Sequence, residues 1–312
     1  MRGRYSTAQW GHQWAAPLLL GGTGVSSNPV RTFAKAAFDS LHVLRSRHTA
    51  RRKARILLAY WRLTFKLVAL ARPLRLRRER FLGFRVESFD YETLHFLFRE
   101  IFVRNEYWFD AASDQPLIFD CGANIGFATL FFKWLYPHSV IHCFEPDRPT
   151  FELLRRNVET NRLSDVHLHN VALSDAAGAI EFYVAADRNG SLLMSLDPQR
   201  AGAGDHKRTI VDGVKLSEFL NGKQVDLVKL DVEGAEGSVM RDLADSGAIK
   251  KIDQFVVEYH HHVDRHKAKL GDFLSLLTQA GFEYQIGAVW ASPQARDEFQ
   301  DVMVQAFRSR EC

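Results

Sequence analysis

The stretch that decides the fold is PLIFDCGANIG, residues 116–126. Its first half is an apolar run typical of a buried strand, over residues 116–121, and a helical pattern follows over residues 125–136. Glycines at 122 and 126 let the backbone turn sharply and approach a ligand closely. The stretch therefore predicts a ligand-binding loop between the carboxyl end of a buried strand and a helix.

Strand and helix patterns alternate through the rest of the chain. Apolar runs predict further strands at residues 139–144, 165–171, 225–232, 254–259, 282–287 and 302–307, with an added alternating strand at 179–185. Amphipathic patterns predict helices at residues 148–162, 238–246 and 266–280. Repeated strand–helix units of this length require parallel strands with helices on both faces. The predicted fold class is α/β, with a doubly wound, seven-stranded, mostly parallel sheet.

The glycine loop differs from a dinucleotide-binding fingerprint. Asn124 takes the place of the middle glycine, and Asp120 precedes the first glycine, where its charge would repel a pyrophosphate. Both features disfavour a nicotinamide dehydrogenase. An acid beside such a loop suits a ligand with an ammonium group and a nucleoside, which describes S-adenosylmethionine.

Glu145 ends the second predicted strand, 19 residues after Gly126. An acid at this place in a doubly wound sheet can accept hydrogen bonds from both ribose hydroxyls. The alternative is an acid at the start of the next helix, beside the predicted cap Asp147. We interpret Glu145 as the ribose-binding residue.

A charged segment, Lys229–Glu236, follows the fourth parallel strand. Alternation places Asp231 and Glu233 on one side of the chain, facing the cleft at the strand ends. Neighbouring carboxylates repel each other unless a metal, a lysine or a ligand cation shares them. The alternative is pairing with the dipole of the following helix. We predict that Asp231 and Glu233 are catalytic, serving either a divalent ion or the hydroxyl of a substrate.

A histidine run, residues 260–262, follows the fifth parallel strand. Alternation places His260, His262 and Glu258 on one face, and His260 is the helper or alternative base. The alternative is a solvated loop. A divalent metal is not predicted, because these residues have no recognised ligand spacing.

Charge divides the chain into two parts. Residues 1–80 carry 17 Lys and Arg against two acids, whereas residues 81–312 carry 24 against 35. We predict a disordered tail at residues 1–30, a basic helical extension at 31–80 and the catalytic domain at 81–312. A basic amphipathic helix at 51–72 either contacts an anionic membrane surface or packs on the domain with its arginines solvated. The acidic body opposes a polyanion and so disfavours nucleic acid as a partner.

The three cysteines cannot form a disulfide framework. Cys121 and Cys143 lie in apolar runs and are predicted to be reduced and buried. The chain contains no uncharged apolar run of membrane-spanning length, and the short run after Arg4 is broken by Pro17 and two glycines. We therefore expect a cytoplasmic protein, with membrane association as the alternative. The oligomeric state is not predicted.

With these motifs in this order, the chain resembles the FkbM family of S-adenosylmethionine-dependent methyltransferases, which have the Rossmann-like class I methyltransferase fold. The resemblance covers residues 84–307. It also rests on EIFVRNEY at residues 100–107, NVALSD at 170–175 and VEYH at 257–260.

The resemblance implies a cofactor, a reaction and a set of site residues. Asp120, Gly122, Asn124 and Gly126 would surround the methionine part of S-adenosylmethionine. Glu145 would hold the ribose, and Asn170 and Ala172 would lie near the adenine. The reaction would be methyl transfer to a hydroxyl of a sugar, polyketide or related small molecule.

The sequence allows more than one interpretation of several segments and of the function. Arg104 and Tyr107 would cover the cofactor or pair with its carboxylate, or Arg104 would be a surface arginine. A small-residue-rich loop at 187–205 would close over the substrate or be a passive excursion. The competing functions are a noncatalytic partner that binds the cofactor or recruits another enzyme to a membrane, and a nucleic-acid methyltransferase.

Overall fold

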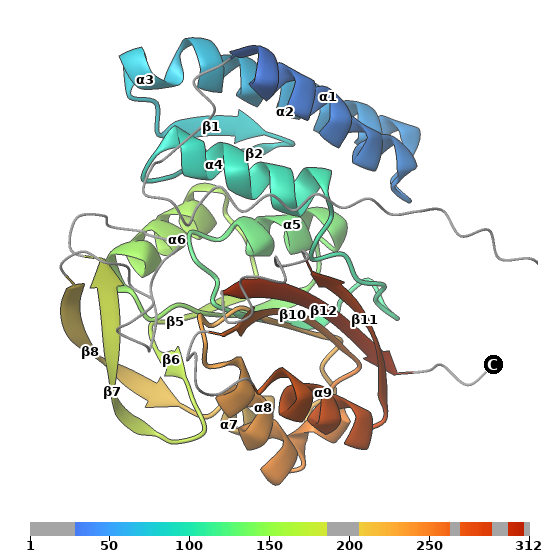
Figure 1. The fold of residues 1–312 in the computed structure, drawn as a ribbon, viewed down its shortest axis with the longest axis vertical. Coiled ribbons are helices and arrows are strands. Elements are labelled where there is room, and N and C mark those ends of the chain that lie inside the picture. The colour runs from blue at the N-terminus through green and yellow to red at the C-terminus, as the bar shows by residue number, and fades with distance from the viewer. Residues whose placement is uncertain (1–28, 186–205, 263–268, 289–298, 309–312) are drawn as a thin grey trace, which may run out of the picture.

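The computed structural model describes residues 29–185, 206–262, 269–288 and 299–308. Its centre is a seven-stranded sheet in the order β11-β12-β10-β9-β3-β4-β5, in which β12 alone runs antiparallel to the other strands (Figure 1). The strands are β3 (Leu117–Cys121), β4 (Val140–Phe144), β5 (Val166–His169), β9 (Leu227–Leu230), β10 (Gln254–His261), β11 (Phe282–Ala288) and β12 (Gln300–Arg308). The predicted doubly wound, mostly parallel sheet is confirmed.

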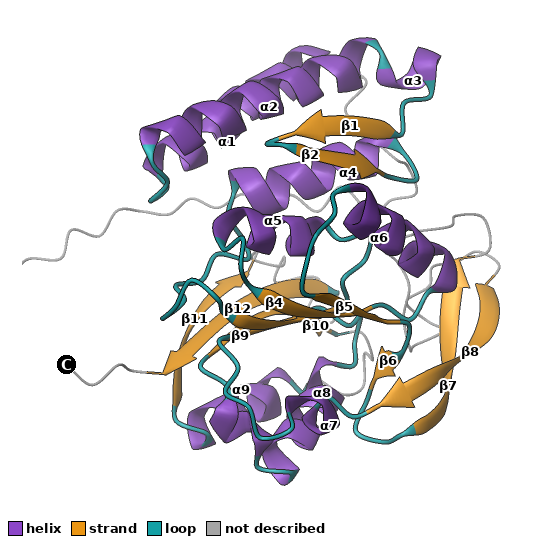
Figure 2. Cartoon of the chain, turned by 180° about the vertical axis from the view of Figure 1, so that it is seen from behind, coloured by secondary structure: helices purple, strands orange, loops and turns teal. Residues whose placement is uncertain are grey.

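Helices cover both faces of this sheet, as Figure 2 shows from behind. One face is covered by α5 (Phe127–Leu135) and α6 (Arg148–Thr160). The other is covered by α7 (Ser217–Leu220), α8 (Glu236–Asp245), the 3₁₀ turn η2 (Ala248–Lys251) and α9 (Leu270–Gln279). Alternation along the strands divides the core, since Ile118 packs in the α5 layer and its neighbour Phe119 in the α8 layer.

A second sheet lies beside the first, in the order β6-β8-β7. It contains β6 (Ala172–Leu173), β7 (Gly178–Ala185) and β8 (His206–Val214). The strand predicted at 179–185 therefore exists but pairs in this smaller sheet, and β8 was not predicted. The loop predicted at 187–205 lies wholly outside the described residues, as do the first residues of the helix predicted at 266–280.

The basic N-terminal part forms a layer on top of α5 and α6 (Figure 1). It contains α1 (Pro29–Arg45), α2 (Ala50–Ala69), the short α3 (Ala71–Leu74), the hairpin β1 (Arg78–Phe81) and β2 (Phe84–Glu87), α4 (Tyr91–Phe98) and the π-helical turn η1 (Arg99–Val103). Its buried side chains, such as Ile56 and Phe102, belong to the same cluster as Phe131 of α5. The boundary at residue 80 stays a prediction, but no separate core divides the two parts in the described residues.

One expectation about this layer needs correction. The helical pattern does not continue to residue 80, because the chain turns into β1 at Arg78. One side of α2 packs on this hairpin: Arg55 donates to the carbonyl of Leu82 at 2.9 Å and Lys66 to Glu79 at 2.8 Å. Packing on the domain is therefore observed for this side of α2.

Cys121 and Cys143 are free thiols with no exposed surface, as predicted. Four phenylalanines of residues 81–109 are buried in the core, namely Phe81, Phe98, Phe102 and Phe109. No helix in the described part of the chain is long and apolar enough to cross a membrane.

Candidate active site

The glycine loop lies at the switch point of the sheet, where β3 pairs with β4 on one side and β9 on the other. Gly122 has a φ of +81°, and a Cβ there would lie 1.7 Å from the carbonyl oxygen of Asp231. The amide of Asp231 in turn donates to Cys121 O at 3.0 Å. Glycine is therefore required at 122, because the loop and the segment after β9 touch backbone to backbone.

The rest of the loop is held from β4. The amides of Gly122 and Ala123 both donate to Phe144 O at 2.9 Å. Asn124 has a φ of +49°, and its side chain accepts from the amide of Ile125 at 2.7 Å, which suits an asparagine in a left-handed conformation. Gly122 and Asn124 are partly exposed, whereas Gly126 is buried at the start of α5.

Glu145 is 3% exposed and lies directly beneath the loop. Its two carboxyl oxygens accept from the amides of Asn124 and Asp147, each at 2.9 Å. Burial raises the pKa of Glu145 to about 8, in spite of these two donors. Each oxygen keeps a second lone pair, so the carboxyl group can accept further bonds from a ligand.

Lys229 is a buried cation at the centre of the site, 2% exposed. Its Nζ donates to Gly122 O at 2.6 Å and to Asp231 at 3.3 Å, and lies 3.6 Å from Asp120. Burial alone lowers its pKa, but Asp231 and Asp120 raise it above the usual value. Lys229 therefore stays charged and links the glycine loop to Asp231.

His260, at the end of β10, is held by a carboxylate that sequence reasoning left without a role. Its Nδ1 lies 2.8 Å from Glu236 Oε1, in the first turn of α8. Burial tends to raise the pKa of Glu236, but His260 and backbone amides hold it below the usual value. Because an ionised Glu236 only accepts, Nδ1 donates this hydrogen bond, and Nε2 is the ring nitrogen that faces away from Glu236.

His260 Nε2 points toward the two predicted catalytic carboxylates. It lies 3.4 Å from Glu233 Oε2 and 3.8 Å from Asp231 Oδ1. Glu233 has a φ of +55°, a strained conformation for a residue other than glycine, and such strain is concentrated at functional sites. The structure therefore brings Asp231, Glu233 and His260 together, although the strand ends at Leu230, earlier than predicted.

These three residues also satisfy the distances of a metal site. One ligand atom from each of Asp231, Glu233 and His260 lies within 4.8 Å of the others. A carboxylate pair with an imidazole is a donor set that divalent transition metals accept. The sequence placed these residues at one cleft, but their spacing matches no recognised metal-ligand pattern, so a metal was not predicted.

Two further acids surround the site. The pKa values of Glu258 and Glu106 are raised well above the usual range, first by burial and then by neighbouring carboxylates. The ring of Tyr107 lies beneath Lys229 Nζ, 5.3 Å from its centroid. Of these residues, the sequence indicated Tyr107 near the cofactor and Glu258 on the face of His260.

The contacts of the remaining predicted site residues bear less directly on cofactor binding. Asp120 is fully buried and accepts from Thr129 at 2.7 Å. Asn170 donates to the carbonyls of Glu145 and Pro146 at 2.9 and 3.0 Å, while Ala172 is buried at the start of β6. Arg104 pairs with Glu100 and Asp39, at 3.2 and 3.4 Å, and so is not a free surface arginine.

A seven-stranded sheet with this strand order, a glycine loop after β3 and an acid after β4 defines a class I S-adenosylmethionine-dependent methyltransferase. The chain belongs to the FkbM family of these enzymes: a family profile described as "Methyltransferase FkbM domain" matches residues 120–284.

Individual relatives agree with this family. The chain is 34% identical over 224 residues to "Methyltransferase 1" of Beauveria bassiana (strain ARSEF 2860), an alignment that covers 65% of this chain and 87% of the relative. It is 30% identical over 220 residues to "31-O-demethyl-FK506 methyltransferase FkbM" of Streptomyces tacrolimicus, with 60% and 81% covered. Among solved structures it is similar to methyltransferase FkbM of Methylobacillus flagellatus KT, with a TM-score of 0.39, 16% identity and 70% and 54% of the two chains covered.

Proposed function

We propose that this methyltransferase transfers a methyl group to a hydroxyl oxygen of a sugar, a polyketide or a related small molecule. The observation that carries the proposal is the orientation of His260. Glu236 holds Nδ1 at 2.8 Å, so Nε2 is directed toward Asp231 and Glu233 at the strand ends. An alcohol is a weak nucleophile at neutral pH, and a base in this orientation removes its proton during attack.

The cofactor residues are assigned from the loop geometry and the family. Gly122, Asn124 and Gly126 would surround the methionine part, with Glu145 at the ribose. Asn170 and Ala172 would lie near the adenine, and Asn170 also orients the backbone at Glu145. Asp120 has no exposed surface, so we propose that it acts through Lys229, which contacts the loop carbonyl.

The reaction itself is an in-line displacement. The hydroxyl oxygen attacks the methyl carbon, the carbon–sulfur bond breaks, and the sulfonium becomes a neutral thioether. The hydroxyl proton passes to Nε2 of His260, and the positive charge that develops there is stabilised by Glu236, Asp231 and Glu233. Positioning of the two reactants supplies much of the rate.

A divalent metal is the second candidate for hydroxyl activation. An ion held by Asp231, Glu233 and His260 would polarise the hydroxyl directly. Exhaustive chelation distinguishes the two: turnover that survives chelation supports His260 as the base, and turnover restored only by added metal supports the ion.

The Streptomyces tacrolimicus relative is named for an O-demethyl substrate, which supports oxygen as the acceptor atom here. The competing hypothesis, a noncatalytic cofactor-binding or recruiting protein, leaves the buried Glu236–His260 pair without a purpose.

Asp231→Asn is expected to abolish turnover while S-adenosylhomocysteine binding is largely retained. The substitution removes a carboxylate that faces His260 and contacts Lys229 but leaves the glycine loop intact. The assay is transfer of radiolabelled methyl groups to fractionated hydroxylated small molecules, with calorimetry for binding. Binding without transfer to any fraction by the wild-type chain would favour the noncatalytic hypothesis.

Glu145 gives the affinity for S-adenosylhomocysteine a pH dependence. Ribose hydroxyls donate to a carboxylate and so favour its charged form, whereas the free protein holds this group protonated below about pH 8. Affinity should therefore rise between pH 6 and 8, by at most about tenfold per pH unit, and level off above. Calorimetry of wild type and Glu145→Gln over this range is the test, and the same slope in both chains would remove the ribose assignment.

A further inference from the structure

The helices α1 and α2 form the outside of the N-terminal layer, away from the central sheet (Figures 1 and 2). On α2, the core side is formed by residues such as Ile56, Leu63 and Leu67, yet Leu58 and Phe65 on the opposite side are 72% and 56% exposed. The outer apolar face consists of Phe38, Leu41 and Leu44 of α1 and Leu58, Trp61 and Phe65 of α2. An apolar face that is not used for the core marks an interaction surface.

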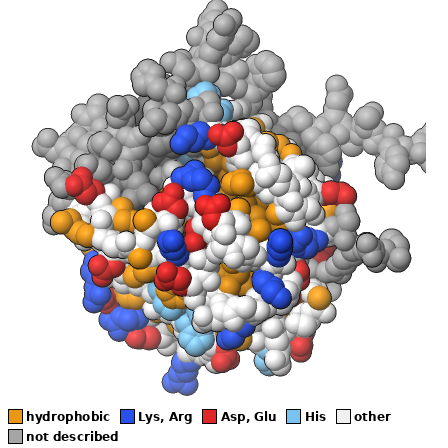
Figure 3. All heavy atoms as spheres, turned by 90° about the horizontal axis from the view of Figure 1, so that it is seen from below, with side chains coloured by type: hydrophobic (Ala, Val, Ile, Leu, Met, Phe, Trp, Pro, Cys, Tyr) orange, Lys and Arg blue, Asp and Glu red, His pale blue; other side chains and the backbone are white. Residues whose placement is uncertain are grey.

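Bases surround this face without exposed acids. Residues 29–80 contain fifteen Lys and Arg, whereas their two acids, Asp39 and Glu79, are both buried. The opposite end of the molecule differs, since the face around α7, α8 and α9 shows acidic and basic side chains close together (Figure 3). The partner of the outer apolar face must therefore be apolar and anionic at once.

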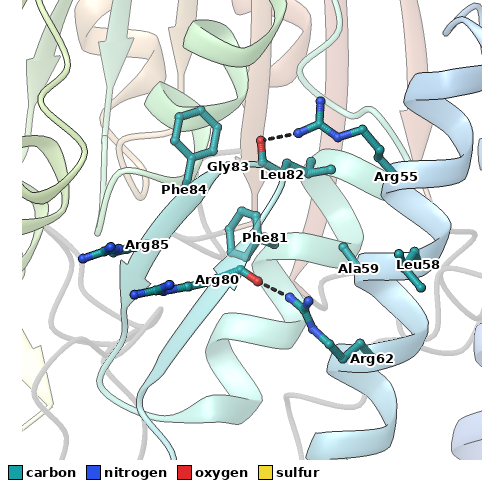
Figure 4. Close-up of a pocket in the computed structure, with 10 residues that line it drawn as sticks. All are labelled: Arg55, Leu58, Ala59, Arg62, Arg80, Phe81, Leu82, Gly83, Phe84 and Arg85. Carbon is teal, nitrogen blue, oxygen red and sulfur yellow. Dashed lines mark hydrogen bonds between the residues drawn. The ribbon is translucent and has the colours of Figure 1, made fainter.

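An arginine-lined pocket of about 410 Å³ adjoins the outer apolar face at Leu58 (Figure 4). Arg55 and Arg62 from α2 reach across it to carbonyls of the β1–β2 hairpin. Arg80 and Arg85 are directly opposed across that hairpin. Like charges in opposed positions are unfavourable unless an anion neutralises them.

We propose that the outer apolar face and the arginine-lined pocket bind the surface of an anionic phospholipid membrane. Leu58, Trp61 and Phe65 enter the boundary between headgroups and acyl chains, as the apolar side of an interfacial helix does. The arginines of the pocket contact phosphate groups of the lipid headgroups. Trp61, with its indole N–H donated to Ser40 at 3.2 Å, has the amphipathic character typical of this depth.

Charge and apolar character together favour an anionic membrane over the other candidate partners of this surface. A second copy of the chain would place one basic layer against another. Residues 1–28 contain Arg2 and Arg4 and no acid, so they cannot neutralise the pocket. A nucleic acid would match the charge but would leave the outer apolar face exposed to water.

The test is flotation of the full chain with lipid vesicles. Binding is expected to vesicles that contain phosphatidylglycerol, not to phosphatidylcholine alone, and to weaken as salt is raised. Leu58→Glu with Phe65→Glu should reduce the binding constant about tenfold or more for each side chain withdrawn. The matched control is Ile210→Glu with Ile286→Glu, two exposed apolar residues elsewhere, which should leave binding unchanged.

A second pair of variants tests the pocket. Arg80→Glu with Arg85→Glu should weaken binding to the anionic vesicles by about fivefold or more for each base removed. The control is Lys250→Glu with Lys251→Glu, exposed bases of η2 at the opposite end. Unchanged melting temperatures and S-adenosylhomocysteine binding show that the variants are folded.

Three results would overturn the proposal. One is a failure of the full chain to bind the anionic vesicles, or an equal loss in test and control variants. Another is a wild-type dimer that Leu58→Glu with Phe65→Glu makes monomeric and that does not bind vesicles. The third is vesicle binding that appears only after residues 1–28 are removed, because that segment would then be the occupant.

Discussion

His260→Ala is expected to lower kcat for methyl transfer by about 10²–10⁴-fold, the range in which a positioned general base contributes. Nε2 of this residue is directed at the two carboxylates of the site, and no change is made to the glycine loop or to Glu145. Binding of S-adenosylhomocysteine should therefore remain close to that of the wild type. The matched control is His138→Ala, an exposed histidine before β4, which should keep full activity.

Glu236 is a positioning residue in this scheme, since it acts through His260. Glu236→Ala should lower kcat, whereas Glu236→Gln, whose side-chain carbonyl accepts the same bond from Nδ1, should restore part of the loss. A purely structural role would instead make kcat follow the melting temperature in both variants. Full activity of His260→Ala together with an inactive Asp231→Asn would show that Asp231 is the base.

Asp39→Ala is expected to lower the free energy of unfolding by about 3–5 kcal/mol, as removal of one partner of a buried ion pair does. Asp39 of α1 has no exposed surface and accepts from Arg99 of η1 at 2.5 and 3.1 Å and from Tyr60 at 3.0 Å. Loss of the Asp39 carboxylate leaves the buried charge of Arg99 less well neutralised. It also removes a contact between α1 and η1. Denaturant unfolding provides the measurement.

The control for Asp39 is an exposed pair of the same chemistry. Asp110 lies 3.4 Å from Arg47, but both side chains are largely exposed, so Asp110→Ala should cost less than about 1 kcal/mol. Equal losses in the two variants would contradict the assigned role of the buried pair.

Acid should weaken the Asp39 contacts. Burial alone raises the pKa of Asp39, but hydrogen bonds and charge from Arg99 and Arg104 hold it below its usual value of 3.8. A lowered pKa in the folded state means that this contribution is present above about pH 4 and is lost as the pH falls through the folded value. Asp39→Asn should lose less stability over the same acid range.

The sheet could be predicted because its signals are local. Each parallel strand is a short apolar run followed by a helical pattern, so β3, β4 and β10 were found close to their observed bounds. The β1–β2 hairpin was missed because RERF and FRVE are charged and alternate too briefly to differ from a helical end. The small sheet was not predicted as a unit, since alternation identifies a strand such as residues 179–185 but not its partner.

The site was predictable only in part. Asp231, Glu233 and His260 could be brought together by the rule that parallel strands present their carboxyl ends at one edge. Glu236 could not be assigned, because an acid in the first turn of a helix is explained by the helix dipole alone. Its contact with His260 spans 24 residues of sequence and depends on how α8 packs against β10. The side of α2 that faces water could not be assigned either, because its apolar residues are spread over more than one side: Ile56 is buried, whereas Leu58 is exposed.

The backbone contact at Gly122 has a consequence for how such an enzyme diversifies. The space at this glycine is filled by the carbonyl of Asp231, and Lys229 bonds to both segments, so the positions of the two halves of the site depend on each other. A substitution that repositions Asp231 for a different acceptor would also displace the loop proposed to hold the cofactor. New acceptor specificity is therefore easier to acquire through peripheral segments than through the residues at the strand ends, which are constrained to change together or not at all.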